Sequence, residues 1–505
     1  MHTAIQALME ANLLIFSGIN ILFIILGSLL GLIFGVIPGL SAPILLSLLI
    51  PLTIPLDFNS ALLLLGAALG GTTFSGSITS ILFGVPGTAN NIATTLDGFP
   101  LAKQGRASEA IAAAALSSVI GSIFGILILL LLIPWLSGIV VAFGPPEVFW
   151  MAMLGILLIS VAARESMFKG LLSGSIGLLL STHGFSDATG FLRFTFGIDY
   201  LWNGFSVLTV VLGLFGIAEV MNLVLGRSKI ADEKTDIPIK GSLLKGFIFT
   251  LKNIFTVIRC GIIGLVIGII PGAGAGIADT VAYVSAKKAS KNPKSFGYGN
   301  MMGVIAPESA NNAKDAGAMI PLLSFGIPGS LSTAILLGAF ILHGINPGPR
   351  MLTEHLPSSM ILVLTVLFSG LLSAVFGLIG LPLWKAITKI PASFLFIFVV
   401  GVSTLGVYGT NSNATDILVT YIFGILGYLM IRYEFNRIAL MLGLVLGPVA
   451  ESSFLRALQI SEGSYAVFLR SAVCIGIVIF MLGWTFLPLI NNWILKKKKV
   501  IQKDE

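Results

Sequence analysis

The sequence predicts an all-α polytopic membrane protein with two inverted-topology repeats, whose helices are broken or re-entrant at Pro-Gly pairs, plus one extra C-terminal helix. Of its 505 residues only 29 are lysine or arginine and 22 aspartate or glutamate, and the mean hydropathy is +1.01. A soluble protein carries roughly 25% charged residues, against 10% here. Because this number of charges is too small to cover a surface that faces water, most of the outer surface must face lipid.

Apolar stretches long enough to cross a bilayer occur throughout the chain and predict about 12 to 15 crossings. The main polar stretch, 227–252, is interpreted as a cytoplasmic basic linker between a first transmembrane repeat, 1–226, and a second, 253–451. Residues 452–505 would hold the extra transmembrane helix and a basic cytoplasmic tail. Most lysines and arginines fall in loops that one orientation places inside, which predicts a periplasmic N-terminus and a cytoplasmic C-terminus.

Two motifs recur in the same order in both halves. Residues 31–39 (GLIFGVIPG) match 264–272 (GLVIGIIPG), and residues 83–88 (FGVPGT) match 325–330 (FGIPGS). The first half crosses an odd number of times in the predicted orientation, so the second copy starts on the opposite side. The sequence therefore predicts inverted repeats, which are a recurrent transporter architecture.

Two apolar stretches, 60–97 and 298–341, are too long for one straight span. A helix over 60–97 would be about 57 Å long, nearly twice the ~30 Å hydrocarbon core. Proline removes a backbone donor and clashes with the preceding turn, so we expect each stretch to break at its Pro-Gly pair. The predicted helix breaks are Pro38, Gly39, Pro86, Gly87, Pro271, Gly272, Pro328 and Gly329.

Small polar side chains surround the breaks at Pro86 and Pro328. Broken backbone at membrane depth occurs only inside protein or beside a water-filled cavity, and the N-terminus of a half-helix attracts a carboxylate. The predicted substrate-binding residues are Ser77, Thr79, Thr88, Asn90, Asn91, Ser309, Asn311, Asn312 and Ser330. The GxxxG pairs, such as Gly31/Gly35 and Gly264/Gly268, are interpreted as helix-packing positions instead.

Acidic residues inside spans are costly, and they mark function by default. The candidates for cation coupling are Asp97, Asp279, Glu308 and Asp315. Two alternatives remain open: Glu308 or Asp315 could simply pair with Lys314, and Asp97 could lie in a loop before Lys103.

Other functional classes lack their motifs. The chain has four histidines without an HExxH pattern, and Cys260 and Cys474 lie far apart in apolar runs, which indicates buried thiols. It also lacks GxxxxGK[ST]. The sequence therefore predicts no enzyme, no nucleic-acid partner, no metal site and no cofactor beyond Na⁺ or H⁺ as coupling ion.

With these motifs in view, the chain resembles the large transmembrane permease subunit of tripartite tricarboxylate transporters, the TctA family. The resemblance rests on Val85–Ala107 (VPGT through LDGFPLAKQGRA) and on Pro307–Asn312 (PESANN), and it extends over essentially the whole chain. The departures are Phe99 where the family often has tyrosine, Ser75 in a usually glycine-rich place, and the charged pair Lys314-Asp315.

The resemblance implies a multi-pass permease of the bacterial inner membrane. Such a permease works with a small membrane subunit and with a periplasmic solute-binding protein that delivers citrate or another carboxylate. A cation gradient would drive uptake. A stand-alone secondary carrier for an organic anion and a passive channel or scaffold are the alternatives.

Overall fold

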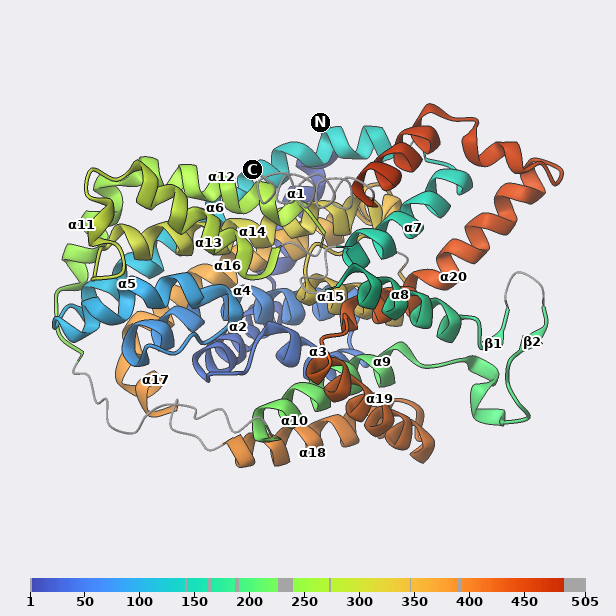
Figure 1. The fold of residues 1–505 in the computed structure, drawn as a ribbon, viewed down its shortest axis with the longest axis horizontal. Helices are drawn as coiled ribbons and strands as arrows, with labels where there is room; N and C mark the ends of the chain where they lie inside the picture. The colour runs from blue at the N-terminus through green and yellow to red at the C-terminus, as the bar shows by residue number, and fades with distance from the viewer. Residues whose placement is uncertain are drawn as a thin grey trace, which may run out of the picture. The chain divides into compact units, whose positions relative to one another are not determined.

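The computed structural model describes residues 2–140, 143–161, 166–186, 190–225, 239–271, 274–345, 347–387 and 392–485. These residues are almost entirely helical (Figure 1), with a short antiparallel ribbon, Gly184–Phe185 on Leu192–Arg193, as their β structure. Six of the described helices are long and apolar enough to cross a membrane, and two bent helix pairs raise the number to eight. The prediction of an all-α polytopic membrane protein is confirmed.

The chain divides into two compact units, each built from separated stretches. Unit 1 comprises Met1–Val141 and Ser206–Ile431, and unit 2 comprises Ala142–Phe205 and Arg432–Glu505. Both halves of the sequence therefore contribute to both units, so the units do not coincide with the two predicted repeats.

Unit 1 contains the helices that surround the candidate site. From the first half it has α1 (His2–Ile15), α2 (Asn20–Val36), α3 (Ala42–Thr53), α4 (Phe58–Phe83), the 3-10 turn η1 (Ala89–Asn91), α5 (Ile92–Lys103) and α6 (Ala107–Val140). It continues with α9 (Val207–Val211), the π-helical segment η3 (Leu212–Ile217), α10 (Ala218–Leu225), α11 (Leu243–Lys252), α12 (Ile254–Ile269), α13 (Gly274–Ala289) and the 3-10 turn η4 (Pro293–Ser295). Its last elements are α14 (Met302–Phe325), α15 (Leu331–Leu342), the 3-10 turn η5 (Pro349–Leu352), α16 (Leu356–Ile379), α17 (Leu381–Ile387), α18 (Ala392–Asn411) and α19 (Ala414–Arg432).

Unit 2 is smaller and also helical. It holds α7 (Pro145–Val161), α8 (Met167–Ser181), β1 (Gly184–Phe185), β2 (Leu192–Arg193), the 3-10 turn η2 (Asp199–Asn203), α20 (Arg437–Ile460), the 3-10 turn η6 (Tyr465–Leu469) and the apolar helix Ala472–Thr485. Arg193 from the ribbon makes two hydrogen bonds to Glu451 of α20, at 2.6 and 2.9 Å. This ion pair attaches the ribbon to the helix. The hydrogen bonds to the Glu451 carboxylate raise the pKa of Arg193 above its ordinary value.

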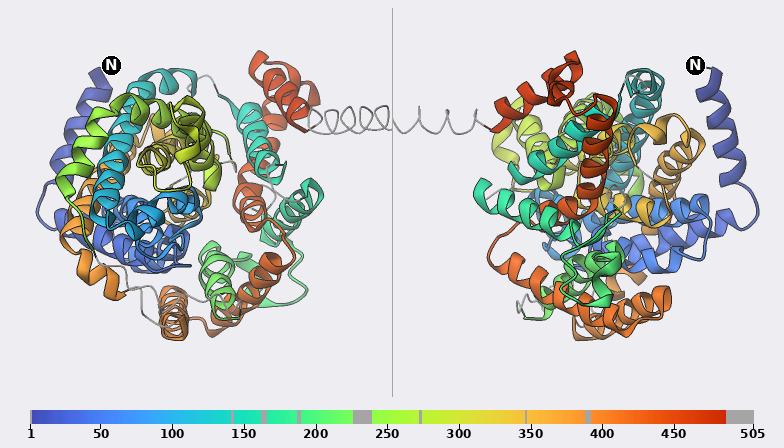
Figure 2. Two further views of the ribbon diagram at one scale, coloured as in Figure 1. Left: turned by 60° about the vertical axis from the view of Figure 1, so that its left-hand side comes forward. Right: turned by 90° about the vertical axis from the view of Figure 1, so that its right-hand side faces the viewer.

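Helices α4 and α14 form the centre of unit 1. Every residue from Ser60 to Leu82 of α4 and from Gly303 to Ser324 of α14 is buried. The helix α4 packs on α2 of its own half and α16 of the other, whereas α14 packs on α12 of its own half and α6 of the other. The peripheral α1, beside the label N in Figure 2, packs on α16. Because protein surrounds α4 and α14, they can carry polar and charged side chains that a lipid-facing helix could not.

The two halves repeat the same local structure at their breaks. The helix α4 ends at Phe83 with Gly84 in the left-handed region (φ 70°), and α14 ends at Phe325 with Gly326 in the same conformation (φ 69°). Each proline follows two residues later, where it commonly stands after a glycine-terminated helix. The breaks predicted at Pro86 and Pro328 are therefore confirmed, with the helix ending slightly earlier than the proline itself.

The earlier breaks also match. The helices α2 and α12 end at Val36 and Ile269, and each is followed by an extended isoleucine, with ψ of 116° for Ile37 and 112° for Ile270. Pro38, Gly39 and Pro271 therefore follow helix ends, as predicted, while Gly272 lies outside the described residues. The two halves thus share a sequence of breaks, and their opposite orientation in the membrane stays a prediction.

Glycines of the GxxxG pairs lie at close helix contacts. A Cβ on Gly31 would stand 2.6 Å from the Ala68 carbonyl oxygen of α4, and one on Gly264 would stand 2.1 Å from that of Ala310 on α14. Real Cβ atoms do not approach so closely, so only glycine lets these helices touch. The interpretation of the pairs as packing positions is confirmed.

Part of the predicted linker is structured. Residues 227–238 lie outside the described part of the chain, whereas 243–252 form α11. The Thr250 hydroxyl of α11 donates to the Ala113 carbonyl of α6 at 3.4 Å, and Gly246 lies directly against α6 at Glu109. The helix α11 meets α12 at a 75° bend.

Candidate functional site

A cavity of about 340 Å³ lies in unit 1 among three of the helix breaks. The segment after α2 lines it with residues 39–43, the first Pro-Gly loop with residues 86–90, and the start of α15 with residues 330–332. Other lining residues are Leu69, Thr72, Thr73, Glu219, Lys314 and Asp315. The segments that follow the helix breaks at Pro38, Pro86 and Pro328 therefore line one cavity.

Two half-helices begin at this cavity. Ser41 precedes α3 and Ser330 precedes α15, and both are lining residues with extended backbone. Ser330 and Thr333 form a capping box, in which each side chain accepts the other's backbone N–H, at 3.3 and 2.8 Å. The first N–H groups of a helix and its positive dipole end attract anions. Both half-helices therefore present a partial positive charge to the cavity.

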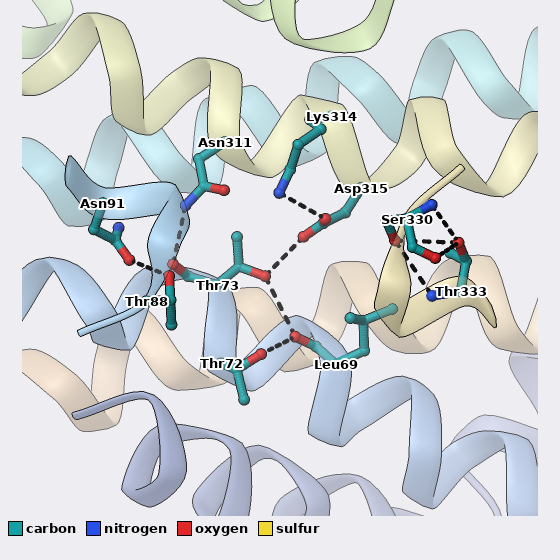
Figure 3. Close-up of polar contacts among 10 residues, drawn as sticks. All are labelled: Leu69, Thr72, Thr73, Thr88, Asn91, Asn311, Lys314, Asp315, Ser330 and Thr333. Atoms are coloured by element: carbon teal, nitrogen blue, oxygen red, sulfur yellow. Dashed lines mark hydrogen bonds and ion pairs between the residues drawn. The ribbon is translucent and has the colours of Figure 1, made fainter. Parts of the chain in front are cut away.

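One buried lysine adds a full positive charge. The Lys314 side chain is 3% exposed, and its Nζ lies 3.3 Å from Asp315 Oδ1. The other carboxylate oxygen of Asp315 accepts a hydrogen bond of 2.8 Å from Thr73 Oγ1 (Figure 3). The pairing of Asp315 with Lys314, which the sequence left open, is therefore present, and it takes place at the cavity wall.

Three of the predicted substrate-binding residues line the cavity, namely Thr88, Asn90 and Ser330. Asn91 is fully buried behind the loop, where Thr88 Oγ1 donates to its Oδ1 at 2.6 Å. Its Nδ2 donates to Ser77 Oγ at 3.1 Å, so Ser77 is also placed behind the wall.

The remaining predicted residues are not among those that line the cavity. Thr79 donates to the Val36 carbonyl at 2.6 Å and so satisfies the end of α2, and Ser309 donates to the Ala306 carbonyl of its own helix. Asn311 donates from Nδ2 to the Thr73 carbonyl at 3.3 Å. Among the described residues, Oδ1 of Asn311 and Oδ1 of Asn312 are buried without a hydrogen-bond partner.

Asp97 is a buried anchor for a distant loop. It lies within α5, not in a loop before Lys103. Its Oδ1 accepts the backbone N–H groups of Gly297, Gly299 and Asn300 at 2.7 to 2.9 Å, and its Oδ2 accepts the Tyr283 hydroxyl at 2.8 Å. Four donors therefore surround this carboxylate, an arrangement that fixes the loop before α14.

The other two acidic candidates are buried in different surroundings. Glu308 is completely buried and accepts hydrogen bonds from Asn91, Thr94 and Ser118, all of them neutral. Asp279 on α13 is 1% exposed, and within the described part of the chain neither of its carboxylate oxygens has a hydrogen-bond partner.

Sequence reasoning missed several lining residues. Lys314 was considered only as a partner for acidic groups, and Ser41, Thr72, Thr73 and Glu219 were not assigned to the site. The repeat itself carried a usable signal, because Thr72 and Thr73 align with Lys314 and Asp315 when the two Pro-Gly breaks are superimposed. For Glu219 the repeat signal was weaker, a partial match of the segment ending at Glu219 (GLFGIAE) to that ending at Glu451 (GLVLGPVAE), and it did not point to the cavity.

Comparison with known proteins agrees with this architecture. The sequence model of the tripartite tricarboxylate transporter TctA family matches residues 21–442. An uncharacterised 52.8 kDa protein in the TAR-I ttuC' 3' region of Agrobacterium vitis is 34% identical over 446 residues, which is 88% of each chain. An uncharacterised protein in the TAR-II ttuC' 3' region of the same organism is 36% identical over 242 residues, 48% of this chain and 100% of its own. No solved structure matches.

Proposed function

The chain belongs to the tripartite tricarboxylate transporter TctA family, and from this we propose that it is the large membrane subunit of a secondary-active carboxylate importer. Its substrate would be a citrate-like tricarboxylate or a related carboxylate, taken up across the bacterial inner membrane with Na⁺ or H⁺. A small membrane subunit and a periplasmic solute-binding protein would be its partners. The N-terminus would lie in the periplasm and the C-terminus in the cytoplasm.

The observation that carries this proposal is the placement of Lys314 in a cavity where α3 and α15 begin. A lysine ammonium and helix N-termini are groups that bind carboxylates in proteins. A substrate carboxylate can take the place of Asp315 beside Lys314, while the Thr73 hydroxyl keeps its hydrogen bond to Asp315. The substrate then replaces one ionic contact by another, so the lysine is never left unpaired.

The charges of the lining residues favour a coupled cation. The lining contains two carboxylates, Glu219 and Asp315, and one ammonium, Lys314. A multiply charged anion that enters this cavity repels both carboxylates, and the repulsion is strong where water is excluded. A cation or proton bound at the same time offsets this repulsion. This charge balance supports symport and argues against a passive route for the anion.

Uptake by proteoliposomes tests the proposal. The full chain is reconstituted with and without its two partner subunits, and radiolabelled citrate, succinate and tartrate are offered under a Na⁺ gradient or a pH gradient. We expect accumulation of at least one carboxylate under one gradient, and exchange of labelled for unlabelled substrate. Uptake without the binding protein would indicate a stand-alone carrier. Flux without counterflow would indicate a channel, and no flux of any of these carboxylates would contradict the proposal.

A further inference from the structure

Glu308 is a buried carboxylate whose hydrogen-bond partners are all neutral side chains from the first half of the chain. Asn91 Nδ2 donates to Oε1 at 3.2 Å, Thr94 Oγ1 donates to the same oxygen, and Ser118 Oγ donates to Oε2 at 3.1 Å. Glu308 itself is 0% exposed. A carboxylate held in this way is costly when charged, and it can accept a proton without any change in volume.

A short hydrogen-bond chain joins Glu308 to the cavity. Asn91 connects them, because its Nδ2 contacts Glu308 while its Oδ1 accepts from Thr88 Oγ1 at 2.6 Å. Thr88 is a cavity-lining residue, whereas Glu308 and Asn91 lie behind it. The state of Glu308 can therefore reach the cavity wall through one amide and one hydroxyl.

The second half shows that a break loop does not require such a connection. When the two Pro-Gly breaks are superimposed, Ser330 aligns with Thr88, Thr333 with Asn91, and Gly66 with Glu308. Ser330 and Thr333 bond to each other at 3.1 Å, so they stabilise their loop locally. Asn91 in the first half and Glu308 in the second therefore each lack an equivalent residue of the same kind in the other half, and the shared loop geometry does not explain them.

The charged and titratable groups around Glu308 come from the helices packed against α14. On these helices and on α14 itself they are Asp279 and Tyr283 (α13), Asp97 (α5), Glu109 (α6), Arg259 and Cys260 (α12), and Lys314 and Asp315 (α14). Of these, Asp279 interacts electrostatically with Glu308, and Glu109 pairs with Arg106. Asp97 is held by its own four donors, and Lys314 is held by Asp315. The hydrogen-bond donors that contact Glu308 in the described residues come from α4 (Ser77), η1, α5 and α6 and carry no charge.

We propose that Glu308 binds the coupling proton and that Asn91 transmits its protonation state to Thr88 at the cavity wall. The inference rests on the proposed carboxylate transport and names the ion and the residues that couple it. A proton from the aqueous phase forms an O–H bond on Glu308 Oε1, which then donates to Asn91 Oδ1 after the amide turns over. The amide Nδ2 then faces Thr88 Oγ1 as a donor, so the Thr88 O–H is free to donate into the cavity.

Both consequences favour an anion in the cavity. Protonation removes one negative charge from behind the wall, and it adds one hydrogen-bond donor at the wall. When the proton leaves, the Glu308 carboxylate again accepts from Asn91, Thr88 again donates to Asn91, and the anion loses both contributions. Substrate and proton are therefore bound together and released together, which is the requirement for symport.

The site suits a proton better than Na⁺. A bound metal cation needs several free oxygen lone pairs around it, but the side chains around Glu308 donate one amide N–H and the hydroxyl protons of Ser77, Thr94 and Ser118 to its oxygens. The buried oxygens without donors, on Asp279, Asn311 and Asn312, are the alternative location for a cation on α13 and α14. Coupling through those residues would be a different mechanism, and the experiment below separates the two.

The test uses Glu308→Gln, a neutral mimic of the protonated state, in the full chain reconstituted with its partner subunits. Labelled citrate is the probe, or whichever carboxylate of the uptake panel proves to be the substrate. Binding and counterflow are measured at equal pH on both sides, from about pH 6 to about pH 8. For the wild type we expect the affinity for the carboxylate to fall as the pH rises, by up to about tenfold per pH unit, which is the limit for one linked proton. For Glu308→Gln we expect affinity that does not change with pH, retained counterflow, and no accumulation under a pH gradient.

Two further variants make the result specific. Thr88→Val, which removes the terminal hydroxyl of the chain, should weaken binding at low pH and flatten its pH dependence. Glu109→Gln makes the same chemical change on α6, where the carboxylate pairs with Arg106 at 2.8 Å, and it should keep the wild-type pH dependence. Size-exclusion profiles identify any variant that does not fold. The second measurement is the number of protons taken up with each substrate molecule by the wild type. We expect at least one proton per substrate.

Three outcomes would overturn the inference. They are wild-type pH dependence in Glu308→Gln, accumulation driven by Na⁺ alone without proton uptake, or pH dependence that is lost in Glu109→Gln as well. If neither the wild type nor any variant exchanges any carboxylate of the panel, the proposed transport function fails instead, so the two failures are distinguishable.

Discussion

Thr73 donates a hydrogen bond of 2.8 Å to Asp315, and these two residues hold the same position in the two halves of the chain. Each lies thirteen residues before the proline of its own break, Pro86 or Pro328. Equivalent residues of a twofold-related pair touch each other only close to the axis, as at the centre of a symmetric dimer interface. The contact, together with the reciprocal packing of α4 and α14, therefore supports a twofold relation between the halves, with the cavity beside its axis.

Replacing Lys314 should abolish uptake and weaken the fold. Lys314→Met removes the ammonium from the cavity and leaves Asp315 buried without a cation, and breaking a buried pair costs about 3–5 kcal/mol. We expect uptake to fall more than about tenfold and the melting temperature to drop. The double variant Lys314→Met, Asp315→Leu should recover the melting temperature but not the uptake.

A surface lysine provides the control for this prediction. Lys169 lies 3.9 Å from Glu434 in a partly exposed pair and donates to the Tyr433 carbonyl at 2.8 Å. Pairs of this kind contribute about 0–1 kcal/mol. Lys169→Met should therefore leave both measurements nearly unchanged. Normal uptake by Lys314→Met would exclude Lys314 from the binding site.

Gly87→Ala should destabilise the first break. A Cβ at this position would stand 2.5 Å from Gly76 Cα and 2.6 Å from the Gly35 carbonyl oxygen, both of them backbone atoms that cannot turn away. Overpacking of this kind costs about 1–3 kcal/mol, and thermal unfolding in detergent measures it. Gly138→Ala is the matched control, because nothing lies within 4 Å of its added Cβ. Equal melting temperatures for the two variants would show that the loop moves away from α2 and α4 easily.

Asp97→Ala should destabilise the fold more than Asp97→Asn does. Neither change should alter the coupling of substrate binding to the proton. Alanine leaves three backbone N–H groups and the Tyr283 hydroxyl without their acceptor, and hydrogen bonds to a charged group contribute about 1.5–3 kcal/mol each. Asparagine keeps one acceptor oxygen and should retain most of the stability. The pH dependence of substrate affinity should be that of the wild type in Asp97→Asn. A lost pH dependence there would assign Asp97 to proton coupling.

His343 should make the fold less stable in mild acid. Burial lowers the pKa of His343, and the nearby Asp57 offsets this only in part. The folded state therefore favours the neutral ring, so this contribution is fully present above the ordinary histidine pKa of about 6.5 and is lost as the pH falls through the lowered value. His343→Gln can keep the contact with Thr53 Oγ1, which is 3.2 Å in the wild type.

The measurement is the difference in melting temperature between His343→Gln and wild type from about pH 8 to about pH 5. We expect the variant to lose less stability than the wild type over this range. Parallel curves for the two proteins would contradict the assignment.

Features that depend on neighbouring residues of the chain could be predicted from the sequence. Pro86 and Pro328 stop helices by their own chemistry, and the preceding Gly84 and Gly326 adopt a left-handed conformation that favours glycine. The breaks could therefore be predicted, and so could the grouping of Thr88, Asn90 and Ser330 beside them. The packing role of Gly31 and Gly264 followed from spacing alone, for the same reason.

The remaining contacts depend on distant parts of the chain. Asp97 could be selected as an acidic candidate, but its role depends on the loop at Gly297–Asn300, which the fold brings from the other half. Likewise, Glu308 could be selected as an acidic residue inside a span, while its partners Thr94 and Ser118 lie on two other helices. The sequence pattern alone does not tell which of the four acidic candidates accept hydrogen bonds from neutral side chains, as Glu308 does, and which accept them from backbone N–H groups, as Asp97 does.

The contact between Thr73 and Asp315 also depends on a difference in sequence between the two halves. Two identical halves that associate as a dimer must place the same residue on both sides of their axis, and two aspartates at this distance would repel each other strongly. A threonine can face an aspartate only where the two halves differ in sequence, as they do at Thr73 and Asp315 of this chain. Because the two halves are different sequences, the centre of unit 1 is chemically one-sided, with a carboxylate on one helix facing a hydroxyl on the other.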